Sequence, residues 1–318
     1  MNSFILTNPF EVESAPLKSG NRRGKVRSKS KEQETLRELS GYSALDVKQL
    51  GLANEEAWQP HTKHAKDFIL RASELVPNKG TCTVIGAGPC FDVPLMELAE
   101  QYDRVELLDL NKENLQTAIS TLPEELAKKV TPRVVEVTHV LPKALSEIKQ
   151  EIAKAGTRTQ RAINKIVGVL NKHHPGPGEL GNIQSDFIVS DMILSQLPTS
   201  LWIVDDWFTR AFPSKLSDYP EWFDMMRDFQ AKLQAAHVEA LLAKQNSIVA
   251  LLTDYGVATT PDEANLQTLL DIKRVTLSIG TLNQLMELQN ASTLFDEWVW
   301  QRESRPLKFS PVWAFCLA

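Results

Sequence analysis

A glycine-rich turn is the feature that most restricts how this 318-residue chain can fold. Residues 84–89 read VIGAGP, and they join a short apolar run to a segment with helical spacing. Glycines at such a turn let backbone N–H groups approach a ligand closely. Asp109 stands 23 residues after Gly86, at the end of a second apolar run, where a carboxylate can accept hydrogen bonds from a ribose diol. The spacing predicts a strand–helix–strand unit that binds a nucleoside-containing ligand.

Short apolar runs alternate with helical patterns through the middle of the chain, which is typical of a parallel sheet covered on both faces. Strands are predicted at 82–85, 104–108, 133–137, 186–189 and 247–252. Helices are predicted at 54–75, 91–100, 112–121, 143–155, 160–170, 221–244 and over most of 261–289. Pro60 predicts a break or kink in the first of these helices, because proline cannot donate the helical hydrogen bond.

Two short aromatic runs near the end of the chain, 297–301 and 312–317, predict a different arrangement. The ten residues between them include Pro306 and Pro311 and leave no room for a crossover helix, so the two strands must pair antiparallel. The expected fold is therefore α/β, a doubly wound, mostly parallel seven-stranded sheet with a C-terminal antiparallel hairpin. Helical insertions are expected near 141–182 and 199–244, within one domain that spans 51–318.

The first fifty residues have a different character. Basic residues without any acidic residue occupy a stretch that has almost nothing to bury: Lys18, Arg22, Arg23, Lys25, Arg27, Lys29 and Lys31. This composition is typical of a disordered arm, which we expect over 1–50. Two interpretations stay open, a solvated tail and a weak contact of residues 18–31 with nucleic acid or an acidic partner.

Composition restricts the environment of the protein. The three cysteines, Cys82, Cys90 and Cys316, show neither a disulfide framework nor metal-ligand spacing, so we expect no metal site and a reducing compartment. The net charge of -5 is too small to indicate a nucleic-acid or membrane partner by itself. No apolar run reaches the length that spans a bilayer. We therefore expect a cytoplasmic protein without membrane contact.

Three segments, 84–89, 105–109 and 186–197, resemble successive motifs of the class I S-adenosylmethionine-dependent methyltransferases. The resemblance covers about residues 54–318, and the hairpin expected at the end of the sheet is also found in that family. It implies S-adenosyl-L-methionine as the cofactor, with the glycine loop around the amino-acid portion, the acid after the second strand on the ribose, and the end of the fourth strand beside the transferred methyl. The cofactor-binding residues implied in this way are Gly86, Ala87, Gly88, Asp109, Leu110, Thr138 and Ser190.

Several positions depart from the family pattern. Val84 stands where an acid is frequent, Cys90 replaces the usual third glycine, and Thr138 with His139 follows the predicted third strand, where an acid often contacts the adenine amine. These departures leave open a catalytically silent module that binds a nucleoside or a partner. A flavin- or NAD-binding oxidoreductase is a further alternative, although Phe91 occupies the position where that motif needs a glycine against the pyrophosphate.

Methyl transfer is an in-line displacement in which positioning supplies much of the catalysis, so few fixed residues are required. Asp191 is a candidate catalytic residue because it follows the fourth strand at the carboxyl edge of the sheet. His61 is a candidate general base because its ordinary pKa lies near neutrality. Both also fit structural roles, as a capping aspartate and a packed histidine. The acceptor is left open, with a small molecule favoured over a protein side chain or RNA.

Overall fold

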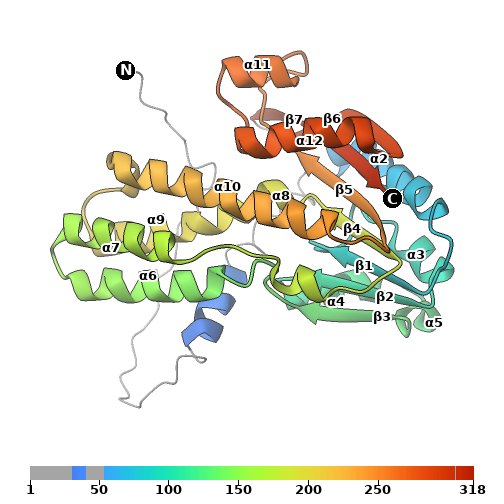
Figure 1. Ribbon diagram of the computed structural model, residues 1–318, viewed down its shortest axis with the longest axis horizontal. Helices are drawn as coiled ribbons and strands as arrows, with labels where there is room; N and C mark the ends of the chain where they lie inside the picture. The colour runs from blue at the N-terminus through green and yellow to red at the C-terminus, as the bar shows by residue number, and fades with distance from the viewer. Residues whose placement is uncertain (1–30, 41–53, 305) are drawn as a thin grey trace.

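The computed structural model describes residues 31–40, 54–304 and 306–318, and its centre is a seven-stranded sheet (Figure 1). The strand order is β3-β2-β1-β4-β5-β7-β6. The strands from β1 to β5 pair in parallel, whereas β7 is antiparallel to both β5 and β6. The bounds are β1 (Thr81–Ile85), β2 (Arg104–Asp109), β3 (Val130–Val134), β4 (Phe187–Asp191), β5 (Ile248–Asp254), β6 (Leu294–Ser304) and β7 (Leu307–Leu317).

The direction of winding reverses between β1 and β4. β2 lies on one side of β1, and β4 lies on the other side, with Ile85 paired with both Leu108 and Ser190. This is the point of an open parallel sheet where loops leave in opposite directions and a crevice opens at the carboxyl ends of the strands. The glycine turn that follows β1 therefore lies at the position where such folds bind ligands.

The sheet has two buried faces because alternate strand residues point to opposite sides. Val84 packs in one hydrophobic cluster and Ile85 in the other. The first cluster takes in α2 (Glu55–Glu74), α3 (Leu95–Gln101) and α4 (Lys112–Ser120). The second takes in α6 (Leu141–Ala155), α7 (Thr159–Lys172), α9 (Trp202–Ala211), α10 (Pro220–Leu242) and α12 (Ile279–Ala291). The shorter helices are α5 (Glu124–Ala127), α8 (Ile193–Gln196) and α11 (Leu266–Asp271), with 3-10 turns η1 (Gly178–Asn182), η2 (Leu197–Leu201) and η3 (Leu216–Asp218).

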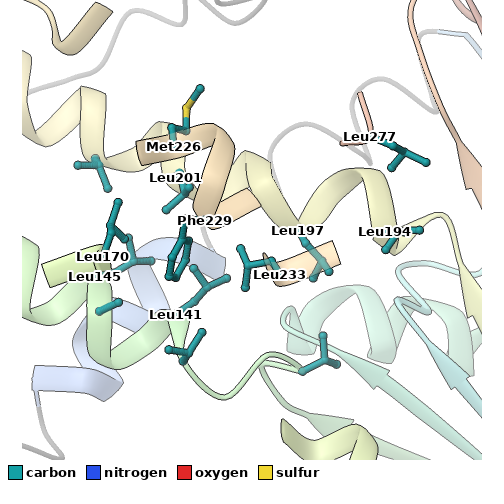
Figure 2. Packing of buried hydrophobic residues seen from close by; sticks show 14 of the residues in the cluster. Leu141, Leu145, Leu170, Leu194, Leu197, Leu201, Met226, Phe229, Leu233 and Leu277 are labelled. Atoms are coloured by element: carbon teal, nitrogen blue, oxygen red, sulfur yellow. The ribbon is translucent and has the colours of Figure 1, made fainter. Parts of the chain in front are cut away.

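The helices between β3 and β4 and those between β4 and β5 form one packed layer. Figure 1 shows α6, α7, α9 and α10 side by side, and α10 contacts α7 while α6 contacts α9. Phe229 and Leu233 of α10 belong to the same buried cluster as Leu141 and Leu145 of α6 (Figure 2). The two inserted segments are therefore parts of one core that continues onto the sheet.

The expected fold class is confirmed, including the antiparallel end of the sheet. The hairpin strands are longer than predicted, since β6 and β7 are separated only by residues 305–306 and Pro311 lies inside β7. The predicted break at Pro60 is wrong, because α2 runs through it. Pro60 and Glu56 are both exposed, so the carbonyl that lacks its helical partner faces solvent.

Two predicted elements had wrong bounds. The strand predicted at 133–137 is β3 at Val130–Val134, because pairing with β2 ends where Val134 meets Asp109 and the chain then leaves the sheet. The helix predicted from residue 91 begins at Leu95, since positive φ angles at Gly88 and Cys90 keep the preceding segment in a loop.

The expectation of a disordered arm over 1–50 is wrong for residues 31–40, which form a helix. Leu39 is 2% exposed and belongs to the core cluster, and Glu38 forms an ion pair with Lys149 of α6. The remainder of the arm, including residues 18–30 of the basic run, lies outside the described residues. Within the described part of the chain, no helix has the length and apolar character needed to cross a membrane.

Candidate functional site

A cavity of about 250 Å³ opens at the carboxyl ends of the parallel strands. Its walls come from the loops after β1, β3 and β4, from the end of β2, and from β6. Leu39 of the helix at 31–40 and Leu141 of α6 also line it. Of the predicted site residues, the cavity brings together Gly86, Ala87, Gly88, Asp109, Leu110 and Asp191.

Backbone geometry requires glycine at the start of the turn. Gly86 has a φ of +75°, and a Cβ there would lie 2.8 Å from the carbonyl oxygen of Asp191. The amides of Gly86 and Ala87 both donate to the carbonyl of Leu108, at 2.9 and 3.1 Å. The turn is thus held between β2 and β4 at a separation that a larger residue would change.

Asp109 ends β2 with both carboxylate oxygens facing backbone donors. Its Oδ2 accepts from Gly88 N at 3.0 Å, and its Oδ1 accepts from Asn111 N at 2.6 Å. Burial raises the pKa of Asp109, and the backbone hydrogen bonds oppose this effect. A carboxylate oxygen can accept two hydrogen bonds, so Asp109 is held in place and still has lone pairs for a ligand in the cavity.

Glu136 is one of the site residues that were not predicted from the sequence, together with Asp92 and Arg302. It lies just past β3 and lines the cavity. Its Oε1 accepts from Thr138 N at 2.9 Å, whereas its buried Oε2 has no hydrogen-bond partner among the described residues. Burial raises its pKa. The signal was present, since Glu136 is the first acid after Val130, but a strand placed at 133–137 put this residue inside the sheet.

Asp191 and Asp92 form a carboxyl pair on the cavity wall. Asp191 ends β4 and is 4% exposed, and Asp92 lies on the loop after β1. Burial, together with the charge of Asp92, raises the pKa of Asp191 well above its usual range. Burial acts in the same direction on Asp92, but its contacts with His61 and Asp191 outweigh this and lower its pKa. The two shifts are opposite, so a proton held by the pair lies on Asp191, and Asp92 is the member whose ionised form is favoured.

His61 stands behind Asp92 and outside the cavity lining. It is 1% exposed and stacks on Trp300 with ring centres 4.3 Å apart. Its Nδ1 accepts the indole N–H of Trp298 at 3.0 Å, and its Nε2 lies 3.5 Å from Asp92 Oδ2. Because an indole nitrogen only donates, the neutral ring must carry its proton on Nε2, toward Asp92. His61 reaches the cavity only through Asp92.

Two predicted cofactor residues lie away from the cavity. Ser190 is fully buried, and its hydroxyl pairs with His237 Nε2 at 2.9 Å on the other face of the sheet. Burial lowers the pKa of His237 to about 4. Thr138 lines a separate small cavity that His237 also lines, and its hydroxyl accepts from Leu141 N. Neither side chain lines the cavity that Asp109 and Glu136 line.

Three aromatic residues, Trp58, Phe91 and Trp300, line one end of the cavity together with Arg302. The two indoles meet edge to face with centres 5.0 Å apart, and Trp58 lies 6.5 Å from Phe91. Among the described residues, no group of three or more His, Cys, Asp or Glu is arranged to hold a metal ion.

The strand order and the antiparallel β7 define this chain as an α/β protein with the class I methyltransferase type of sheet. No family model matches the chain, and no curated protein matches it. Among solved structures, magnesium protoporphyrin IX methyltransferase from Synechocystis PCC 6803, solved with SAH, is similar over 92% of this chain and 95% of its own, at 12% identity and a TM-score of 0.40.

Two other similar structures have related descriptions. A SAM-dependent methyltransferase from Leishmania major matches 91% of this chain and 83% of its own, at 13% identity and a TM-score of 0.38. A putative RNA methyltransferase from Pyrococcus horikoshii matches 80% and 83%, at 10% identity and a TM-score of 0.35. Likenesses this distant say nothing about the substrate, and we therefore infer the function from the residues of the site.

Proposed function

We propose that this protein is an S-adenosylmethionine-dependent methyltransferase whose acceptor is a small molecule. The observation that carries the proposal is the pair of half-buried acids that line the cavity beside the glycine turn, Asp109 at the end of β2 and Glu136 just past the end of the neighbouring strand β3. A nucleoside offers hydroxyl and amine donors, which are what the free lone pairs of these carboxylates need.

The charge of the cavity supports this ligand over a dinucleotide. The ionisable side chains that line it among the described residues are four carboxyl groups and the guanidinium of Arg302. Such a site favours a ligand with cationic groups and opposes a pyrophosphate, because like charges repel strongly where water is excluded. Phe91 also lines the wall near the turn, where a pyrophosphate would need close backbone approach. The flavin- or NAD-binding alternative is therefore disfavoured.

The cofactor would supply an electrophilic methyl group on a sulfonium. Asp109 would hold the ribose hydroxyls, and Glu136 Oε2 would accept a hydrogen bond from the adenine amine. Gly86, Ala87, Gly88 and Leu110 would shape the wall against the cofactor by backbone and van der Waals contact. Thr138 and Ser190, predicted as cofactor residues, have no part in this arrangement.

The carboxyl pair gives the site a group that can take a proton from the acceptor. Asp92, as the ionised member, would accept that proton, and Asp191 would donate a hydrogen bond from its protonated carboxyl. His61 would act as a positioning residue, because its Nε2–H faces Asp92 and not the cavity. This refines the two predicted catalytic residues, Asp191 and His61, by placing Asp92 between them.

A catalytically silent nucleoside-binding module is the second candidate. It is favoured by Val84 and Cys90, which stand where the family pattern has other residues, while Glu136 supplies the acid that had appeared to be missing. A cytoplasmic location and a contact of residues 18–31 with nucleic acid or an acidic partner stay predictions.

Calorimetric titration with S-adenosylmethionine and S-adenosylhomocysteine tests the proposal. Asp109→Ala should weaken binding by about 1.5–3 kcal/mol, roughly tenfold or more, because a charged hydrogen-bond acceptor is lost. Asp103→Ala, an exposed site just before β2, is the matched control and should leave binding unchanged. If the folded wild-type protein binds neither ligand, the proposal fails. Binding without turnover over a broad panel of acceptors would favour the silent module.

A further inference from the structure

Arg302 is the cationic side chain that lines the cavity among the described residues. It comes from β6, and its side chain is 19% exposed. The other charged groups of the lining are carboxyl groups, which lie at the ends of β2 and β4 and in the loops after β1 and β3. Arg302 therefore gives one end of an acidic cavity the opposite charge.

The contacts of Arg302 leave its hydrogen-bond donors available. Among the described residues its guanidinium faces one carboxylate, Asp254 Oδ2 at 3.8 Å, a distance too long for a hydrogen bond. Asp254 is fully buried, and its Oδ1 accepts from the Ser195 hydroxyl. A guanidinium carries five N–H donors in a planar fork. Asp254 thus orients the charge of Arg302 while leaving that fork free for a ligand.

Aromatic side chains lie beside this charge. Trp300 lies beneath the guanidinium, with 5.9 Å from its carbon to the ring centre, and the indole N–H of Trp58 donates to the Arg302 carbonyl at 2.9 Å. The hydrogen bond fixes the Trp58 ring, which meets Trp300 and Phe91 edge on. Rigid aromatic walls of this kind favour a planar ring as the occupant.

The order of the strands separates the Arg302 end of the cavity from the end where Asp109 and Glu136 would hold the nucleoside. Asp254 ends β5, and three strand spacings, about 14 Å, lie between β5 and the β2 strand of Asp109. The Asp92–Asp191 pair lies between them, at β1 and β4. A ligand held by Arg302 would thus meet the cofactor at the carboxyl pair, which is where an acceptor must lie.

We propose that the methyl acceptor is a planar aromatic small molecule carrying one carboxylate, with Arg302 as the residue that selects it. A single guanidinium can pair with one carboxylate, and its planar fork matches that group in two-point contact. A polyanion such as RNA would be repelled by the ionised carboxylates of the cavity. This inference rests on the proposed function.

The test is titration of the protein saturated with S-adenosylhomocysteine. The probes are indole-3-acetate and 4-hydroxybenzoate, each paired with its uncharged amide. At least one carboxylate should bind tenfold or more tightly than its amide. Arg302→Gln should abolish that preference, and Arg302→Lys should keep part of it. Arg104→Gln is the control, because Arg104 lies at the start of β2, at the other end of the strand from Asp109. This variant should keep the preference for the carboxylate in full.

Two further measurements keep the result interpretable. The double variant Arg302→Gln with Asp254→Asn removes both charges together, so the preference can be measured without an unpaired buried carboxylate. Affinity for S-adenosylhomocysteine should stay within twofold in every Arg302 variant. A tenfold loss for that ligand, with adenosine binding unchanged, would assign Arg302 to the carboxylate of the cofactor and overturn the proposal.

Equal binding of acid and amide, or binding of neither, would also overturn it while leaving the proposed function intact. Failure of the wild-type protein to bind S-adenosylhomocysteine is a different result, because it would contradict the proposed methyltransferase function itself.

Discussion

The indole N–H of Trp298 donates a 3.0 Å hydrogen bond to Nδ1 of His61, joining residues 237 positions apart in the chain. Since this bond occupies Nδ1 as an acceptor, the proton of the neutral ring is on Nε2, which faces Asp92. A donor on β6 thus determines the orientation and protonation of a side chain on α2, and through it the state of the carboxyl pair.

Trp298→Phe should release this constraint. We expect nitrogen NMR of the wild-type protein to show neutral His61 with its proton on Nε2, and the variant to show a mixture of both tautomers. Loss of the hydrogen bond should lower the free energy of unfolding by about 0.5–1.5 kcal/mol. Trp313→Phe is the matched control, because its indole donates to Glu297 and should leave the His61 signals unchanged. An unchanged tautomer in Trp298→Phe would contradict the assignment.

Glu136→Gln should separate ligand binding from stability. The amide can still accept from Thr138 N, but it replaces the free acceptor Oε2 with a donor. Binding of S-adenosylhomocysteine should weaken by about 1.5–3 kcal/mol by calorimetry. The free energy of unfolding at pH 7 should stay equal or rise, since a buried charge is removed. Glu125→Gln, exposed on α5, should change neither, and equal affinity in both variants would exclude Glu136 from the site.

Gly86→Ala should destabilise the protein by about 1–3 kcal/mol, because the new Cβ adds strain at a positive φ. It would also lie 2.8 Å from the Asp191 carbonyl, so β4 must shift and ligand binding should fall as well. Gly168→Ala in α7 is the matched control. Its Cβ would meet open space, and alanine should stabilise that helix by about 1 kcal/mol. Chemical denaturation measures both, and equal stabilities for the two variants would contradict the close approach.

The carboxyl pair predicts a specific pH dependence of stability. The folded state raises the pKa of Asp191 above its ordinary value of about 3.9, so it binds that proton more tightly than the unfolded chain does. Its contribution to stability is therefore complete below pH 4 and is lost as pH rises through the folded pKa. Asp191→Asn is neutral throughout, so the unfolding free energy of wild type minus variant should fall from pH 4 to pH 8. A difference that rises over this range would contradict the assignment of the proton to Asp191.

Features of the fold that depend on local chemistry could be predicted from the sequence. Alternation of apolar runs and helical patterns predicted the parallel strands, and the short proline-containing connection predicted the antiparallel hairpin. Gly86 and Asp109 were found because a tight turn and the next strand end are separated by one helix, a nearly constant length of chain. Each of these signals lies within about thirty residues.

Other features depend on contacts between distant segments. The end of β3 is set by its pairing with β2, and that pairing moved Glu136 from a predicted strand interior to the wall of the cavity. Ser190 and Asp191 are adjacent in sequence, but the pleat of β4 turns one toward His237 and the other toward Asp92.

The sequence by itself determined the sheet, its order of elements and the glycine turn, because hydrophobic periodicity and backbone sterics act over a few residues. The tertiary structure alone decided which side chains meet, as with Arg302 of β6 beside Asp254 of β5 and His61 of α2 hydrogen-bonded to Trp298 of β6. The shifted pKa values and the free donors of the site result from burial and from the proximity of side chains. Burial and proximity arise only when strands far apart in the chain pack together.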